Sequence, residues 1–142
     1  MIQIKYLLIL LVLMIGLNAC AADVQKIEDT PTNGVEVLYF HGKQRCATCQ
    51  AIEKETKALI DSQFADAVKS GKVRFRVVDI TKSENEALAD KYEITWSSLV
   101  IVKYSKCKET AENLTQFAFA NARSNPAHFK KELAAKINQM LK

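Results

Sequence analysis

Residues 35–52 read VEVLYFHGKQRCATCQAI, and this stretch places two cysteines, Cys46 and Cys49, between a short apolar run and a long amphipathic one. The run VEVLYF at 35–40 predicts a strand. Beyond Cys49, mostly apolar residues recur at steps of three and four, as on one face of a helix: Ile52, Thr56, Leu59, Ile60, Phe64, Ala67 and Val68. The stretch therefore predicts a strand, a loop and a helix that begins at the cysteine pair.

A pair of thiols two residues apart can close a small disulfide ring. On the first turn of a helix, Cys46 would face unpaired backbone N–H groups and the positive end of the helix dipole. Lys43 and Arg45 add positive charge nearby. Such settings lower a cysteine pKa from about 8.5 to roughly 3.5–7.5. The residues therefore favour a reactive Cys46, with Cys49 one turn further in and more buried.

The N-terminal residues predict a targeting segment. Lys5 precedes about 12 almost wholly apolar residues, which suits a secretory signal and is shorter than the roughly 20 residues of a membrane-spanning helix. The segment ends in Leu17-Asn18-Ala19-Cys20 and resembles the lipobox of bacterial lipoproteins, in which the cysteine is lipidated. This resemblance implies a signal peptide at 1–19 and a lipid on Cys20. Ordinary signal cleavage and an uncleaved anchor are the alternatives.

A lipid on Cys20 would hold the protein at a membrane surface of the cell envelope, facing the periplasm. Ala21 follows in place of the aspartate that commonly retains lipoproteins at the inner membrane, which slightly favours the outer membrane. Residues 20–33 are then a tether, with a short edge strand expected near 24–27. Residues 34–142 are expected to form one domain.

Composition excludes a nucleic-acid-binding protein. The 142 residues carry a formal net charge of +4, and loss of residues 1–19 removes one lysine and no acid, which lowers that charge by one. The charged residues are spread along the chain without a basic run or an aromatic stacking motif. With Cys20 assigned to lipidation and Cys46 and Cys49 to a pair, Cys107 is left over.

The rest of the chain predicts an alternation of helices and strands. The first helix is expected from Cys46 to about Ser70, where Gly71 stops it. Further strands are expected at 73–80, 98–104 and 114–122, with a polar turn at 105–112. Helices are expected at 83–91, behind the capping box SENE, and from Asn125 and Pro126 to the end of the chain.

These elements predict an α/β sandwich with a mixed four-stranded sheet flanked by helices. Strands joined through helices are expected to be parallel, with right-handed crossovers, and the last two strands to form an antiparallel hairpin. Five phenylalanines are expected in the core: Phe64, Phe75, Phe117, Phe119 and Phe129.

At this point the chain resembles the thioredoxin-like superfamily. CATC stands where thioredoxins carry their redox CxxC, on the first turn of the helix after a central strand. The segment VVDI at 77–80, followed by ALADKYEI at 87–94, is similar to a thioredoxin segment. The resemblance covers roughly residues 35–142 and implies a thioredoxin-like three-layer sandwich and thiol–disulfide exchange.

The chain departs from the family at the position that faces the dithiol. Thioredoxins have a cis-proline there, and here the matching residue is Ser97, after Trp96. A cis bond before a non-proline residue costs about 2.5–4 kcal/mol, so we expect Trp96–Ser97 to be trans. The resemblance implies that Trp96 and Ser97 border the dithiol and contact substrate, although Trp96 could equally be a half-buried packing residue.

Two further departures lie near the motif. The buried acid of thioredoxins has Tyr39 or Phe40 as its counterpart, and Glu36 lies too early in the strand. Arg45 replaces the tryptophan that precedes the first cysteine, and we predict that it contacts substrate.

The leading hypothesis is a lipid-anchored envelope thiol–disulfide oxidoreductase. Cys46 is predicted to attack a substrate disulfide and Cys49 to resolve the mixed disulfide. The partners would be a protein or small-molecule disulfide or thiol and a membrane redox partner, and no bound cofactor or resident metal is called for. Cys107, in the turn beyond the strand at 98–104, is expected at the far end of the sheet and away from catalysis.

Two other hypotheses remain open. The dithiol could bind a soft metal or metalloid, and since two cysteines are too few for a closed zinc site, His41, Ser97 or a second chain would have to add ligands. Otherwise His41 is a loop residue with an ordinary hydrogen bond. The third hypothesis is a non-catalytic thioredoxin-like module that docks a partner.

Overall fold

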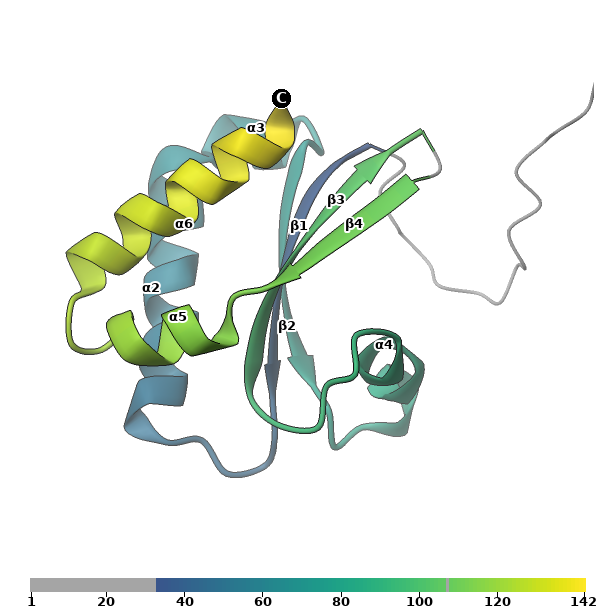
Figure 1. Ribbon diagram of the computed structural model, residues 1–142, viewed down its shortest axis with the longest axis vertical. Helices are drawn as coiled ribbons and strands as arrows, with labels where there is room; N and C mark the ends of the chain where they lie inside the picture. Colours follow the sequence, from purple (N-terminus) through teal and green to yellow (C-terminus); the bar gives the residue numbers. More distant parts are fainter. Residues whose placement is uncertain (1–32, 107) are drawn as a thin grey trace, which may run out of the picture. The chain divides into compact units, whose positions relative to one another are not determined.

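The computed structural model describes residues 33–106 and 108–142, which form the domain (Figure 1). The predicted signal peptide and tether, Cys20 among them, and Cys107 lie outside the described residues. No helix in the described part is both long and apolar enough to cross a membrane.

One strand is central to the sheet. Strand β1 (Gly34–His41) is hydrogen-bonded on one side to β2 (Val73–Asp79) and on the other to β3 (Ser98–Ser105). Strand β4 (Lys108–Asn113) completes a four-stranded sheet of order β2-β1-β3-β4. Residues 35–40 are all buried, as expected of a strand covered on both faces.

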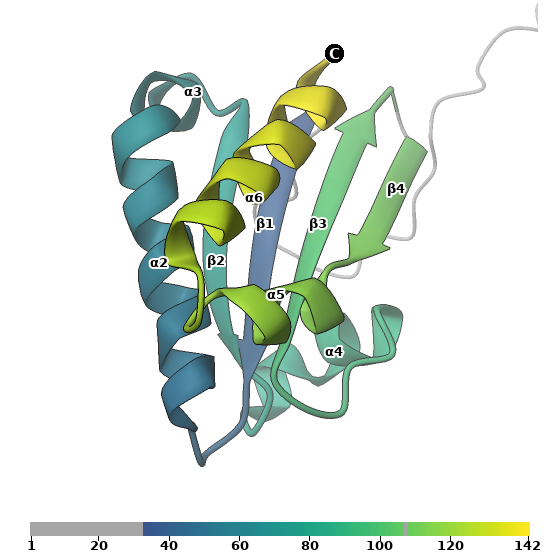
Figure 2. The same cartoon turned by 60° about the vertical axis from the view of Figure 1, so that its left-hand side comes forward.

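Helices cover both faces of the sheet, as Figures 1 and 2 show. One face carries α2 (Ala47–Gln63), the short α3 (Ala65–Lys69), α5 (Thr115–Asn121) and α6 (Pro126–Leu141), and it holds the larger of two hydrophobic clusters. The other face carries a 3-10 turn (Ser83–Asn85) and α4 (Glu86–Lys91) over the smaller cluster. The predicted fold class is confirmed: a thioredoxin-like three-layer α/β sandwich with a mixed four-stranded sheet.

The direction of β3 corrects one prediction. Strands β1 and β2 are parallel, as expected for a crossover through α2, but β3 runs antiparallel to β1 although a helix also precedes it. Helix α4 has six residues and spans only about 9 Å, while the seven-residue β2 spans about 23 Å. The connection therefore turns back at the end of the sheet where β2 stops, and β3 starts from there.

The strand predicted at 114–122 is wrong, and so is the polar turn predicted at 105–112. Residues 108–113 form β4, whose polar side chains suit an exposed edge strand, and 115–121 form α5. Leu114, Ala118 and Ala122 are the buried apolar residues there, and their spacing of four is that of a helix.

The long first helix is broken. Phe64 leaves helical geometry at φ −121° and ψ 14° while its ring is buried, so α2 ends at Gln63 and α3 follows separately. Gly71 ends α3 with a φ of +73°, the stop that the sequence predicted. Phe64 and Phe129 are buried as expected, but Phe75, Phe117 and Phe119 are only partly buried at the rim of the larger cluster.

A buried carboxylate lies on the face of β1 opposite the CxxC helix. Glu36 is 1% exposed and accepts hydrogen bonds from Arg76 (Nη1, 3.3 Å) and the Tyr104 hydroxyl (3.2 Å). Burial and the nearby carboxylates raise the pKa of Tyr104 to about 12, so it stays a neutral donor. These partners compensate a charge that would be costly to bury alone.

A substitution at Gly34, the first residue of β1, tests the close packing of the backbone at the start of this strand. Gly34 has a φ of +127°, and a Cβ there would lie 2.6 Å from the Lys72 carbonyl oxygen, which is backbone and cannot move aside cheaply. We expect Gly34→Ala to lower the free energy of unfolding by about 2–5 kcal/mol, from backbone strain and overpacking together. Urea denaturation followed by circular dichroism measures the loss.

The matched control is Gly42→Ala, since a Cβ at Gly42 meets nothing within 4 Å and its φ is not positive. This variant should keep the parent stability or gain slightly. Equal midpoints for the two variants would contradict the packing described for Gly34.

Candidate active site

The Cys46–Cys49 pair lies at the start of α2, just after the loop that follows β1. Cys46 is the N-cap residue of α2, in extended backbone geometry (φ −68°, ψ 164°), and Cys49 is on the first turn. The two are joined as a disulfide, with their Cα atoms 5.0 Å apart. The predicted placement of the pair at the helix start is therefore confirmed.

The sulfur of Cys46 acts as the helix cap. The backbone N–H of Cys49 donates to Cys46 Sγ at 3.0 Å, so the sulfur takes the place that a serine or aspartate oxygen commonly fills. This N–H and the helix dipole favour negative charge on that sulfur once the disulfide is reduced.

The two cysteines differ in their exposure to solvent. Cys46 is exposed to solvent, whereas Cys49 is 5% exposed and faces the core side of α2. An incoming disulfide can therefore reach Cys46 first, and Cys49 is covered by its own domain. The geometry fits the predicted order of attack and leaves the two roles to be tested.

Of Tyr39 and Phe40, the two residues predicted as counterparts of a buried acid, Tyr39 is the one on the face of β1 that carries α2, beneath the pair. Its side chain is fully buried and its hydroxyl donates to the carbonyl oxygen of Cys49 at 2.8 Å. Burial raises the pKa of Tyr39, against a smaller opposing effect of the nearby Arg45 and Ser97 side chains. Tyr39 is therefore a neutral donor at pH 7 that fixes the first turn of α2 to β1.

Arg45 provides less positive charge to the site than the sequence suggested. Its guanidinium forms an ion pair with Glu53, one turn and a half along α2, and lies 5.8 Å from the centre of the Tyr39 ring. The carboxylate offsets much of its field at Cys46. The exposed Lys43 has no ion pair within the described residues.

Ser97 reaches the site and Trp96 lies beside it. Ser97 is 8% exposed and lies close enough to Tyr39 to lower the pKa of its hydroxyl, and the Trp96–Ser97 bond is trans, since the described residues contain no cis peptide bond. Trp96 is 58% exposed, and its ring packs on Phe119 of α5, with centroids 5.3 Å apart. The structure thus places Ser97 and Arg45 near Tyr39, which bonds to Cys49, and makes Trp96 a surface residue next to Ser97.

A shallow pocket of about 580 Å³ adjoins Trp96. It is lined by Trp96, Ser98, Asn113, Thr115, Gln116 and Phe119. The prediction of a strand at 114–122 leaves this pocket unpredicted, because α5 forms part of its wall. Glu53 and Phe119 were likewise missed, since neither belongs to the CxxC motif.

Among the described residues, neither of the two histidines, His41 and His128, forms a hydrogen bond with Cys46 or Cys49. His41 is the last residue of β1 rather than a loop residue; its Nδ1 lies 3.0 Å from the Gly42 carbonyl oxygen and its ring stacks on Tyr39. Within residues 33–106 and 108–142, no three His, Cys, Asp or Glu side chains gather as metal ligands. His128 is exposed on α6, against the edge of Phe117.

The chain is similar in structure to solved proteins that include thioredoxins. The chain is similar to Fasciola hepatica thioredoxin at 23% identity, over 77% of this chain and 83% of that one, with a TM-score of 0.48. It is also similar to Trxlp from Edwardsiella tarda (14%, 72% and 84%, TM-score 0.46) and to a thioredoxin from Thermus thermophilus (15%, 72% and 72%, TM-score 0.45). No family model and no curated protein matches the chain. What establishes the fold is the strand order and the connections of the chain itself.

The Tyr39 hydroxyl offers a test of the site's architecture. Tyr39→Phe keeps the ring and removes the donor, which leaves the Cys49 carbonyl with one partner fewer in a buried place. We expect the oxidised protein to lose about 0.5–1.5 kcal/mol of stability. Urea denaturation of the oxidised form measures this.

Tyr92→Phe is the control for this substitution. The Tyr92 hydroxyl donates to Glu109 near the surface, where water can replace it, so its removal should cost less. A Tyr39→Phe protein as stable as the parent would show that the hydroxyl does not hold α2 on β1.

Proposed function

We propose that this protein is a thiol–disulfide oxidoreductase in which Cys46 is the nucleophile and Cys49 the resolving cysteine. The observation that carries the proposal is the solvent-exposed residue Cys46 at the N-cap of the 17-residue helix α2, disulfide-bonded to a buried Cys49. A disulfide placed only for stability would gain little, because so short a ring removes little chain entropy from the unfolded state.

The exchange proceeds in two steps. The Cys46 thiolate attacks one sulfur of a substrate disulfide, forms a mixed disulfide and releases the other substrate sulfur as a thiolate. The Cys49 thiolate then attacks Cys46 Sγ, closes the Cys46–Cys49 disulfide and releases the second substrate thiolate. The substrate gains two electrons and the protein loses two, which a dithiol partner at the membrane must return. The reverse sequence oxidises a substrate dithiol.

Three neighbouring residues are proposed to contact the substrate. Ser97 immediately precedes β3 and lies near Tyr39, Arg45 precedes Cys46, and the exposed Trp96 is adjacent to Ser97 in the chain. The exposed indole suits a protein substrate, on which it could cover apolar surface near the disulfide.

The proposed location is the cell envelope. It rests on the lipobox-like residues 17–20, with Cys20 as the lipidated residue and the domain facing the periplasm. An oxidising compartment also suits a disulfide as the resting form of the pair. The outer membrane is favoured because Ala21 follows Cys20.

Substitution of single cysteines tests the two catalytic roles. Cys46→Ser should abolish reduction of insulin and exchange with glutathione, because no exposed thiolate remains in the pair. Cys49→Ser should still attack but be unable to resolve, so it should accumulate a mixed disulfide that mass spectrometry detects. Cys107→Ser is the matched control and should keep the parent activity.

Activity of the Cys46→Ser protein equal to the parent would exclude this mechanism. The same proteins address the other two hypotheses. Tight, cysteine-dependent binding of Cu(I), Zn²⁺ or arsenite to a reduced protein without exchange activity would favour the metal site. An unchanged cellular phenotype after loss of both cysteines would favour the docking module.

Lipidation is tested separately. The full chain expressed in a bacterial host should incorporate a labelled fatty acid and sediment with membranes, whereas Cys20→Ala should do neither. Cys107→Ala should behave like the parent. Equal labelling of the Cys20→Ala protein would rule out Cys20 as the lipidated residue.

A further inference from the structure

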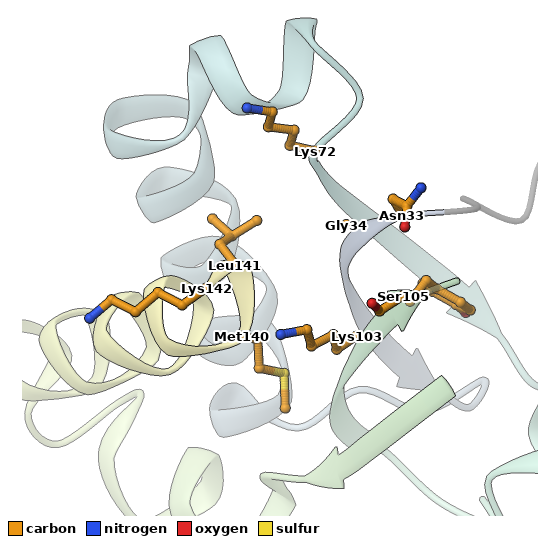
Figure 3. Close-up of a pocket in the computed structure, with 9 residues that line it drawn as sticks. Asn33, Gly34, Lys72, Lys103, Ser105, Met140, Leu141 and Lys142 are labelled. Carbon is orange, nitrogen blue, oxygen red and sulfur yellow. The ribbon is translucent and has the colours of Figure 1, made fainter. Parts of the chain in front are cut away.

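A basic pocket lies at the end of the sheet opposite the dithiol. It has a volume of about 410 Å³ and is lined by residues from the start of β1, the end of β3, the turn before β2 and the end of α6 (Figure 3). Three lysines contribute to it: Lys72, Lys103 and Lys142. No acidic side chain lines it.

These three lysines gather around one pocket and, like Lys43, Lys54, Lys82 and Lys131, form no ion pair with a carboxylate within the described residues, in contrast to five other lysines. Lys57, Lys69, Lys91, Lys130 and Lys136 each form an ion pair with a carboxylate. Within the described residues, no ion pair joins Lys72, Lys103 or Lys142 to an acidic side chain. The pocket therefore has a positive excess, and Lys106 and Lys108 follow the end of β3, in the turn and at the start of β4.

Apolar groups lie among these charges. Leu141 is 36% exposed at the last turn of α6, and the partly buried Met140 lies beside it (Figure 3). Unpaired lysines around exposed apolar side chains are the combination that binds the interface of an anionic membrane.

The lysines are arranged for a surface rather than for one ion. In Figure 3 the ammonium groups of Lys72, Lys103 and Lys142 do not meet at a single point. A site for one free phosphate needs donors that converge on it. Separated ammonium groups can instead each contact a different headgroup. This arrangement favours binding of a lipid surface over binding of a single soluble anion.

We propose that this end of the domain rests on anionic phospholipid headgroups, so that the dithiol points away from the membrane. The inference rests on the proposed lipid anchor at Cys20. Figures 1 and 2 show the start of β1 and the end of α6 at one end of the domain and the β1–α2 junction at the other. The eight residues of β1 separate the two ends by about 26 Å.

The length of the tether supports this occupant. The described chain begins at Asn33, which lines the basic pocket, and Cys20 is 13 residues earlier. Such a segment reaches at most about 45 Å and has a root-mean-square span of about 20 Å if flexible. A lipid at Cys20 would therefore keep the basic end close to the membrane. The resulting high effective concentration allows even weak contacts with the headgroups to form.

The chain's single tryptophan provides the test, because Trp96 lies near the dithiol end. The full chain is added to vesicles of phosphatidylcholine with 30% phosphatidylglycerol and brominated acyl chains, and fluorescence quenching is measured. Trp96 should not be quenched. In a second protein, Trp96→Phe with Leu141→Trp, the indole at position 141 should be quenched strongly.

Charge dependence identifies the lysines. Lys72→Gln, Lys103→Gln and Lys142→Gln together, in the position-141 reporter, should weaken the interaction that gives quenching on the order of 100-fold, about fivefold for each lysine. The control replaces Lys54, Lys82 and Lys131, which are exposed on other parts of the domain, with glutamine, and should retain quenching. Vesicles without phosphatidylglycerol, or 0.5 M salt, should also reduce quenching.

Three outcomes would overturn the proposal: no quenching at position 141 on the anionic vesicles, equal quenching of both reporters, or equal loss in the two triple variants. The result is separable from the proposed function. Fatty-acid labelling reports lipidation and insulin reduction reports exchange, so quenching that depends on the three lysines supports the surface even in a chain that lacks the lipid or the activity.

Discussion

The position at which β1 ends is the constraint on which the site depends. β1 is hydrogen-bonded on both edges and buried on both faces, so it cannot shift by one residue without exchanging its core side chains between the two layers. Its end fixes the short loop to α2, and the loop fixes Cys46 at the helix N-cap. Because Tyr39 bonds to the Cys49 carbonyl, the strand also holds the first helical turn directly.

The two polar groups buried along β1 serve different purposes. Glu36 and Tyr39 are three residues apart and so lie on opposite faces of the strand. Glu36 is satisfied by Arg76 and Tyr104, on the face that carries α4. Tyr39 lies under the CxxC helix, near Arg45 and Ser97. The neutral phenol of Tyr39 donates a hydrogen bond without adding negative charge. An ionised acid at the same place would repel a cysteine thiolate formed above it when the pair is reduced.

Charge and chemistry are divided between the ends of the domain. At the dithiol end, the arginine next to Cys46 is matched by Glu53, and exposed aromatic surface is provided by Trp96. At the other end, lysines are left unmatched beside Leu141. Such an arrangement suits the two different partners proposed above, a disulfide substrate at one end and a charged surface at the other.

The sequence by itself determined the elements with strong local signals: the buried strand 35–40, the cysteine pair at a helix start, the stop at Gly71 and the trans bond at Ser97. It failed where local signals were ambiguous. The segment 114–122 alternates enough to suggest a strand, but only contacts with the rest of the domain decide which of its residues are buried, and those follow a spacing of four. Likewise, the direction of β3 depends on the length of α4 relative to β2, and the pairing of Arg45 with Glu53 depends on how the loop folds over α2. These features arise from packing between residues distant along the chain, and therefore only the tertiary structure decided them.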